Sequence, residues 1–181
     1  GVHATRVVAD PWRSRMVARL GERRWKGLYT LVAVIGFTLI VWGYPMARQD
    51  PVVLWSPLPT GVRHLAALLN LVAFVLLAAA YVPRNHLQAR LGHPLVLGAK
   101  TWAFAHLVVN NTLADVLLFG GFLAWAIAAY ASLRRRDRAA GRVNPPGRAS
   151  RTLAAVLVGG VLWAVMAFWL HEAWIKVRPF G

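Results

Sequence analysis

The sequence contains no cysteine and only six acidic residues among its 181 positions. Without cysteine there is no disulfide framework, no thiolate metal site and no thiol nucleophile. The six acidic residues are opposed by 21 lysines and arginines, so the formal net charge is +15. A charge so one-sided is typical of a protein that binds either nucleic acid or an anionic membrane surface.

Long apolar runs decide between these two partners. The chain is 58% hydrophobic, and a run of about 20 apolar residues is long enough to cross the hydrocarbon core of a bilayer. We therefore expect an all-α, polytopic transmembrane helical bundle, in which the third and shortest run is tilted or partly buried by its neighbours. The five candidate runs are Leu28–Met46, His64–Val82, Pro94–Val109, Leu113–Leu133 and Thr152–Trp174.

The basic residues alternate with the apolar runs. Most of them lie in residues 6–26, 84–90 and 134–151, whereas the connections 47–61 and 110–112 have only Arg48 between them. Lysine and arginine collect in the cytoplasmic loops of membrane proteins. This alternation predicts a multi-pass protein of the bacterial inner (cytoplasmic) membrane, with cytoplasmic basic loops and a periplasmic C-terminus. It accounts for most of the charge without nucleic acid, which we do not expect as a partner.

The segment before the first run is expected to contact the membrane surface. It opens with an Asp-Pro pair, which is typical of a helix N-terminus. Trp12, Met16 and Leu20 then share one helical face, with arginines around them. Residues 10–27 are therefore predicted to form an amphipathic helix in the headgroup layer. An ordinary solvated basic loop is the alternative.

Several ionisable or amide side chains lie inside or at the ends of the apolar runs, where such groups are costly and often functional. Five of the six histidines are among them, and only His86 lies plainly in a loop. A single membrane histidine more often joins two helices, but five without a cysteine also fit a haem or a metal ion. The set comprises His3, His64, His93, His106, His171, Lys100, Asp115, Glu172, Asn70, Asn110 and Asn111.

Helical geometry limits which histidines can share a ligand. His93 and His106 are 13 residues apart in one run, which separates them by about 20 Å along a helix. They cannot bind the same iron, so a single haem needs one histidine from this helix and another from elsewhere. His106 and Asn110 share a face. Lys100 faces protein or a cavity, where it would pair with Asp115 or a haem propionate; a snorkelling lysine without a ligand is the alternative.

Several stretches of the chain resemble the NnrU family of bacterial membrane proteins. They include GVHATRVVAD, RLGERRWKGLYTLVAVIGFTLIVWGY, GHPLVLGAKTWAFAHLVVNNTLADVLLFGGFLAW and the ending FWLHEAWIKVRPFG. The most specific part comprises His93-Pro94, Lys100, Trp102 and His106-Leu107, followed by an asparagine turn. The family usually has Asn-Gly at that turn, whereas this chain has Asn110-Asn111. Because the resemblance covers nearly all of the chain, we expect one domain over residues 1–181.

The resemblance implies a haem site. NnrU-type proteins support nitrite and nitric oxide reduction in denitrification, and their plant and cyanobacterial relatives are haem b-containing 15-cis-zeta-carotene isomerases. The haem-ligating histidines of these relatives correspond to His3 and His106, which are therefore the expected axial ligands of the iron. Judged by depth in the bilayer alone, His93 is the alternative partner of His3. The other residues expected at the cofactor are Lys100, Trp102 and Asn110.

The leading hypothesis is thus a haem b-binding membrane protein that supports nitrite and nitric oxide reduction. The family pattern also places a spanning helix before GVHATR, so Gly1–Val8 is expected to be the end of a sixth span. The expected partners are the lipid bilayer, a lipophilic or gaseous small molecule, and nitric oxide reductase or another membrane redox protein. Two alternatives are a haem-dependent carotenoid cis-trans isomerase and a cofactor-free membrane assembly protein whose histidines only join helices.

Overall fold

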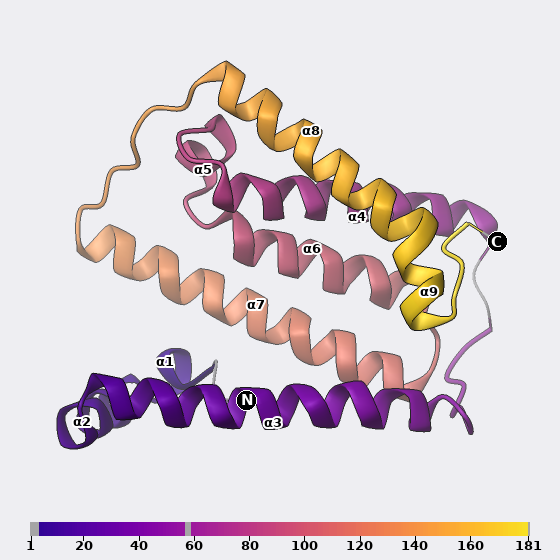
Figure 1. Ribbon diagram of the computed structural model, residues 1–181, viewed down its shortest axis with the longest axis horizontal. Helices are drawn as coiled ribbons and strands as arrows, with labels where there is room; N and C mark the ends of the chain where they lie inside the picture. Colours follow the sequence, from indigo (N-terminus) through magenta and orange to yellow (C-terminus); the bar gives the residue numbers. More distant parts are fainter. Residues whose placement is uncertain (1–3, 57–58, 181) are drawn as a thin grey trace. The chain divides into compact units, whose positions relative to one another are not determined.

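A computed structural model describes residues 4–56 and 59–180 of the chain (Figure 1). Over these two ranges the regular secondary structure is helical, and the only β-type pairing is an isolated bridge between Val53 and Thr112. Contacts within the chain define two compact units, Gly1–Val52 and Val53–Gly181. Each unit is described by itself. The all-α class predicted from the sequence is confirmed.

The first unit contains α1 (Thr5–Val8), α2 (Asp10–Leu20) and α3 (Glu22–Ala47). Gly21 separates α2 from α3 because its φ of +78° lies in a region that only glycine adopts readily. The amphipathic helix expected over residues 10–27 therefore ends at Leu20, and its last residues belong to α3. Trp12 of α2 packs edge-on against Trp25 of α3, with ring centroids 5.8 Å apart.

Helix α3 is a single apolar rod that contains the first predicted span. Its 26 residues expose large apolar side chains around the whole circumference, including Val34, Phe37 and Trp42, which is 70% exposed. Soluble proteins rarely expose so large a contiguous apolar surface. A helix satisfies its own backbone hydrogen bonds, so lipid can cover such a surface at no polar cost.

The second unit is built around α4. Helices α6 and α8 pack on α4, and α7 packs on α6, which gives the order α8, α4, α6, α7 seen in Figure 1. Its elements are α4 (Thr60–Tyr81), α5 (His86–Leu91), α6 (Pro94–Val109), α7 (Leu113–Ala139), α8 (Ala149–Val165), the π-helical turn η2 (Met166–Leu170) and α9 (His171–Ile175).

Small residues let these helices approach closely. Gly159 of α8 lies against the backbone of Val75, where an added Cβ would be 2.5 Å from the Val75 Cα. Gly98 of α6 lies against α4 as well, where an added Cβ would be 3.0 Å from the Ala73 carbonyl oxygen. Alanines fill most of the buried core positions. Close backbone contact through glycine and alanine is typical of helices packed within a membrane.

Among the described residues, four helices are long and apolar enough to cross a membrane. They are α3, α4, α7 and the continuous helix from Ala149 to Ile175. The chain is therefore a multi-helix membrane protein. Helix α6 has the predicted bounds Pro94–Val109 but is shorter than the other four, so the count of five spans stays a prediction.

The basic segments of the second unit meet at one end of it. The Arg148 amide donates to the Arg84 carbonyl at 2.7 Å, and the His86 amide donates to the Thr152 hydroxyl at 2.9 Å. The loop predicted over residues 134–151 is partly helical, because α7 continues to Ala139 and α8 begins at Ala149.

The two connections with few basic residues, 47–61 and 110–112, meet at another end of the unit. The Leu54 amide donates to the Asn111 carbonyl at 2.8 Å, and the Asn111 side chain donates to the Trp55 carbonyl at 2.7 Å. The arginine-rich segments and the arginine-poor connections are therefore joined by separate sets of hydrogen bonds.

Candidate functional site

His106 lies in the last turn of α6, within a group of aromatic side chains from α6 and α7. Its ring stacks on Phe119 with centroids 4.7 Å apart and an interplanar angle of 30°. Trp102 lies one helical turn earlier, 4.9 Å from the His106 ring. Trp102 also packs edge-on against Phe119 and Phe122. The sequence prediction that His106 and Trp102 belong to one site is consistent with this geometry.

One hydrogen bond determines which nitrogen of His106 can bind a ligand. His106 Nδ1 lies 2.8 Å from the Trp102 carbonyl oxygen. A carbonyl oxygen can only accept, so Nδ1 must carry the hydrogen. In the neutral imidazole, Nε2 then holds the lone pair. Histidines that bind a metal commonly have this arrangement, in which the second nitrogen donates to a carbonyl and fixes the tautomer.

The residues after His106 stabilise the end of its helix. The Asn110 side-chain amide donates to the His106 carbonyl at 2.8 Å. Helix α7 then begins with a capping box, in which Asp115 accepts from the Thr112 backbone amide at 3.1 Å and from its hydroxyl at 2.6 Å. Asn110 and Asp115 therefore hold the α6–α7 turn in place. Lys100 is half-buried in α6.

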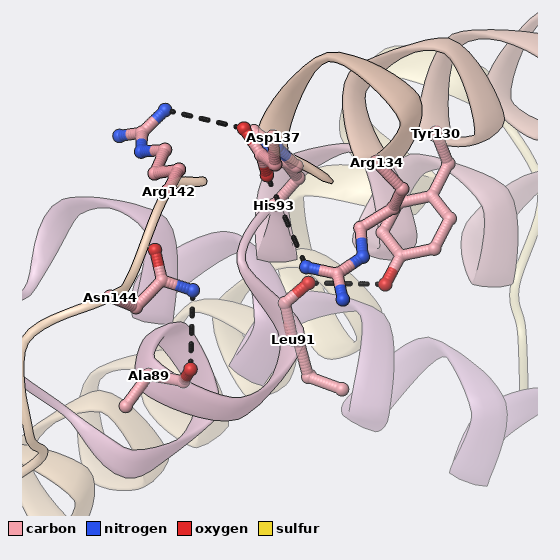
Figure 2. Close-up of polar contacts among 8 residues, drawn as sticks. All are labelled: Ala89, Leu91, His93, Tyr130, Arg134, Asp137, Arg142 and Asn144. Carbon is pink, nitrogen blue, oxygen red and sulfur yellow. Dashed lines mark hydrogen bonds and ion pairs between the residues drawn. The ribbon is translucent and has the colours of Figure 1, made fainter. Parts of the chain in front are cut away.

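His93 is part of a second polar cluster, shown in Figure 2. Its Nε2 lies 2.7 Å from Asp137 Oδ2, and the side chains of both residues are mostly buried, with exposed fractions of 16% and 12%. Arg142 and Arg134 approach the same carboxylate at 3.7 and 4.0 Å. The cluster ties the start of α6 to the end of α7.

Two further hydrogen bonds complete this cluster. The Tyr130 hydroxyl of α7 donates to the Leu91 carbonyl at 3.1 Å, and the Asn144 side chain donates to the Ala89 carbonyl at 3.2 Å (Figure 2). Sequence reasoning missed Asp137, although an acidic residue within a run of arginines was a signal that it has a specific partner. The hydrogen bond to Asp137 occupies the nitrogen with which His93 would otherwise bind iron.

Comparison with known protein families identifies the family of the chain. A family model described as NnrU protein matches residues 1–179. The chain belongs to the NnrU family. Neither curated proteins nor solved structures gave a match.

The other histidines of this NnrU-family chain differ in their surroundings. His3, the expected second axial ligand, lies outside the described residues. His64 and His86 are exposed, whereas His171 is half-buried and donates from Nδ1 to the Val177 carbonyl at 2.7 Å. Within the described ranges, no three histidine, aspartate or glutamate side chains gather closely enough to hold a metal ion.

Replacing Asp137 by asparagine is expected to lower the melting temperature of the detergent-solubilised protein. The change removes the negative charge of a mostly buried carboxylate, so His93 and the two arginines lose the charged group to which they are directed. Asp50→Asn is the matched control, because Asp50 is exposed. Equal melting temperatures for the two variants would show that the cluster does not stabilise the fold.

Proposed function

We propose that the protein is a haem b-binding, multi-pass protein of the bacterial inner membrane that supports nitrite and nitric oxide reduction. In this proposal, α3, α4, α6, α7 and the helix from Ala149 to Ile175 are five spans. The proposal rests on family membership and on one feature of the fold, the His106 site. Haem would supply a redox-active iron that binds small gaseous ligands.

The tautomer of His106 is the observation that carries the proposal. Its Nδ1–H is committed to the Trp102 carbonyl, so Nε2 is the nitrogen with a lone pair. Phe119 and Trp102 surround the ring with apolar surface, which suits the porphyrin of a haem. Half-buried Lys100 lies in the same helix and is proposed to pair with a propionate. His3, implied by the family resemblance, would be the second ligand of the iron.

The cofactor-free alternative describes His93 better than His106. His93 joins two helices through Asp137, as a structural histidine does. By contrast, the hydrogen bond of His106 returns to its own helix, four residues earlier, so its ring contacts another helix through stacking on Phe119. Its stacking on Phe119 needs no imidazole, since a phenylalanine would fill the same space. A purely structural role thus leaves the choice of histidine at position 106 unexplained.

The test is an absorption spectrum of the purified protein, taken before and after reduction with dithionite. We expect a Soret band, together with visible bands that sharpen on reduction, as for a histidine-ligated haem b. Protein that shows no Soret band, either after expression with a haem precursor or after addition of haemin, would contradict the proposal.

The proposal also fixes the orientation in the membrane. The end of the second unit that holds residues 84–90 and 134–151 is proposed to be cytoplasmic, because these residues include most of the unit's arginines. Since the chain has no cysteine of its own, a maleimide can react only with a cysteine that is introduced, and labelling shows on which side of the membrane that cysteine lies. In intact spheroplasts, a membrane-impermeant maleimide should label Ser56→Cys but not Ala140→Cys. Both residues are exposed, so labelling of Ala140→Cys alone would reverse the orientation.

A further inference from the structure

Three arginines, here called the arginine triplet, lie where α4 ends and α8 begins (Figure 1). The Arg84 carbonyl, in the turn that follows α4, accepts a hydrogen bond from the Arg148 amide at 2.7 Å. Arg151 lies in the first turn of α8. All three residues are exposed. The fold therefore brings together positive charges from two distant segments of the chain.

Several contacts fix the backbone that carries the triplet. Arg84 has a left-handed φ of +61°, which is uncommon for a residue other than glycine, and its amide donates to the Gln88 side chain at 3.2 Å. The Thr152 hydroxyl accepts a hydrogen bond from the His86 amide at 2.9 Å. Gly147 lies so close to His86 that an added Cβ would be 2.6 Å from the His86 Cα. The two segments are thus held together by backbone contacts, and the arginine side chains are not needed for this.

The acidic residues of the second unit are engaged elsewhere. Asp115 caps α7, Asp137 belongs to the cluster of Figure 2, and Glu172 pairs with Arg178. Within residues 4–56 and 59–180, no ion pair involves a member of the arginine triplet. Like charges that are held together repel one another. An anion from outside the chain would relieve this repulsion, and a phosphate group matches the geometry of guanidinium donors.

The surface of α8 beyond the triplet indicates which kind of phosphate fits. Val158 and Leu162 follow Arg151 after about two and three helical turns, so they share its face of the helix. Together with Leu157 and Val161 they line a shallow, open, apolar hollow. The helix that carries this hollow is long and apolar enough to cross a membrane. A phospholipid combines a phosphate at the level of the arginines with an acyl chain that would lie along the hollow.

We propose that the arginine triplet binds the phosphate of an anionic phospholipid, whose acyl chain lies along the apolar hollow of α8. Basic pockets between membrane helices bind anionic headgroups in this way. A free phosphate ion or an acidic soluble protein would use the arginines but not the hollow, so the lipid is the occupant that the surface fits. The proposal needs neither haem nor a particular orientation in the membrane, and it goes beyond the proposed function.

The experiment measures lipid binding to the delipidated full chain in detergent by native mass spectrometry. Wild-type protein should bind phosphatidylglycerol more tightly than phosphatidylcholine. The double variant Arg84→Gln/Arg148→Gln should bind phosphatidylglycerol about 25-fold more weakly, because each arginine at a headgroup contributes about fivefold. The control, Arg135→Gln/Arg138→Gln, loses the same charge from exposed positions near the end of α7, which packs on α6. It should retain the preference for phosphatidylglycerol.

Three results would overturn the inference. Equal binding of the two lipids by the wild type would favour an acidic protein as the partner of the triplet. Displacement of phosphatidylglycerol by an equal concentration of inorganic phosphate would indicate a site for the free ion. An equal loss of binding in the two double variants would show that only the total charge of this end of the unit matters.

A single variant covers the case in which the double variant does not fold. Arg151 is exposed and forms no ion pair with a described residue, so Arg151→Gln should melt like the wild type in the absence of lipid. It should bind phosphatidylglycerol about fivefold more weakly, and Arg151→Lys, which keeps the charge, should recover most of the binding. Arg151→Gln protein that binds this lipid as tightly as the wild type would contradict the proposal.

Discussion

Replacing Gly159 by alanine is expected to destabilise the packing of α8 on α4 strongly. A Cβ at this position would be 2.5 Å from the Val75 Cα and 2.8 Å from the Val75 nitrogen. These are backbone atoms, so the helices must move apart rather than a side chain rotate away. Overpacking of this kind typically costs about 1–3 kcal/mol. This exceeds the gain in helix propensity on replacing glycine by alanine, which is at most about 1 kcal/mol.

The neighbouring glycine provides the matched control. Gly160 lies in the same helix, but an added Cβ would meet nothing within 4 Å. Gly160→Ala should therefore retain or slightly raise the stability, measured by unfolding in increasing concentrations of sodium dodecyl sulfate. If Gly159→Ala is as stable as Gly160→Ala, the close approach of α8 to α4 is not part of the native fold.

Replacing His106 by alanine is expected to abolish haem binding. In the proposed site, Nε2 of His106 would bind the iron, and the aromatic rings around it would supply no replacement ligand. The spectrum of the purified variant should lack the Soret band of the wild type. Its melting temperature should be lower than that of wild-type protein stripped of haem, because the alanine loses the ring contacts of His106 with Phe119 and Trp102.

His86→Ala is the control for this prediction, since His86 is exposed and lies in the predicted loop. It should retain the full Soret band. A His106→Ala protein that binds haem as well as His86→Ala would rule out His106 as a ligand, even if haem binding itself were established.

The sequence predicted the helices well, because their ends are marked chemically. Pro94 can begin a helix but cannot continue one from before it, and Asn110 caps the end, so the bounds Pro94–Val109 were predicted correctly. The helix predicted over residues 10–27 was too long. It ends at Leu20, and no proline or asparagine next to Gly21 indicates the break. The π-helical turn over Met166–Leu170 was not predicted from the sequence.

Contacts between distant residues were less accessible to sequence reasoning. His93 and Asp137 are 44 positions apart, and only the fold shows that α6 begins where α7 ends. Gly159 and Gly160 are indistinguishable in the sequence, yet only Gly159 faces α4. Trp102 was expected near the cofactor because of the family resemblance, whereas the spacing of His106 and Asn110 was informative because residues four positions apart share one face of a helix. Periodicity predicts contacts within a helix, whereas contacts between helices depend on the packing.

The most direct measurement is the haem content of the purified wild-type chain, determined as its pyridine haemochrome and divided by the protein concentration. Expressed with sufficient haem precursor, the chain should contain one haem b per molecule, which converts on dithionite reduction to a histidine-ligated ferrous spectrum. Protein that is folded and monodisperse but free of haem, and that does not take up added haemin, would contradict the account.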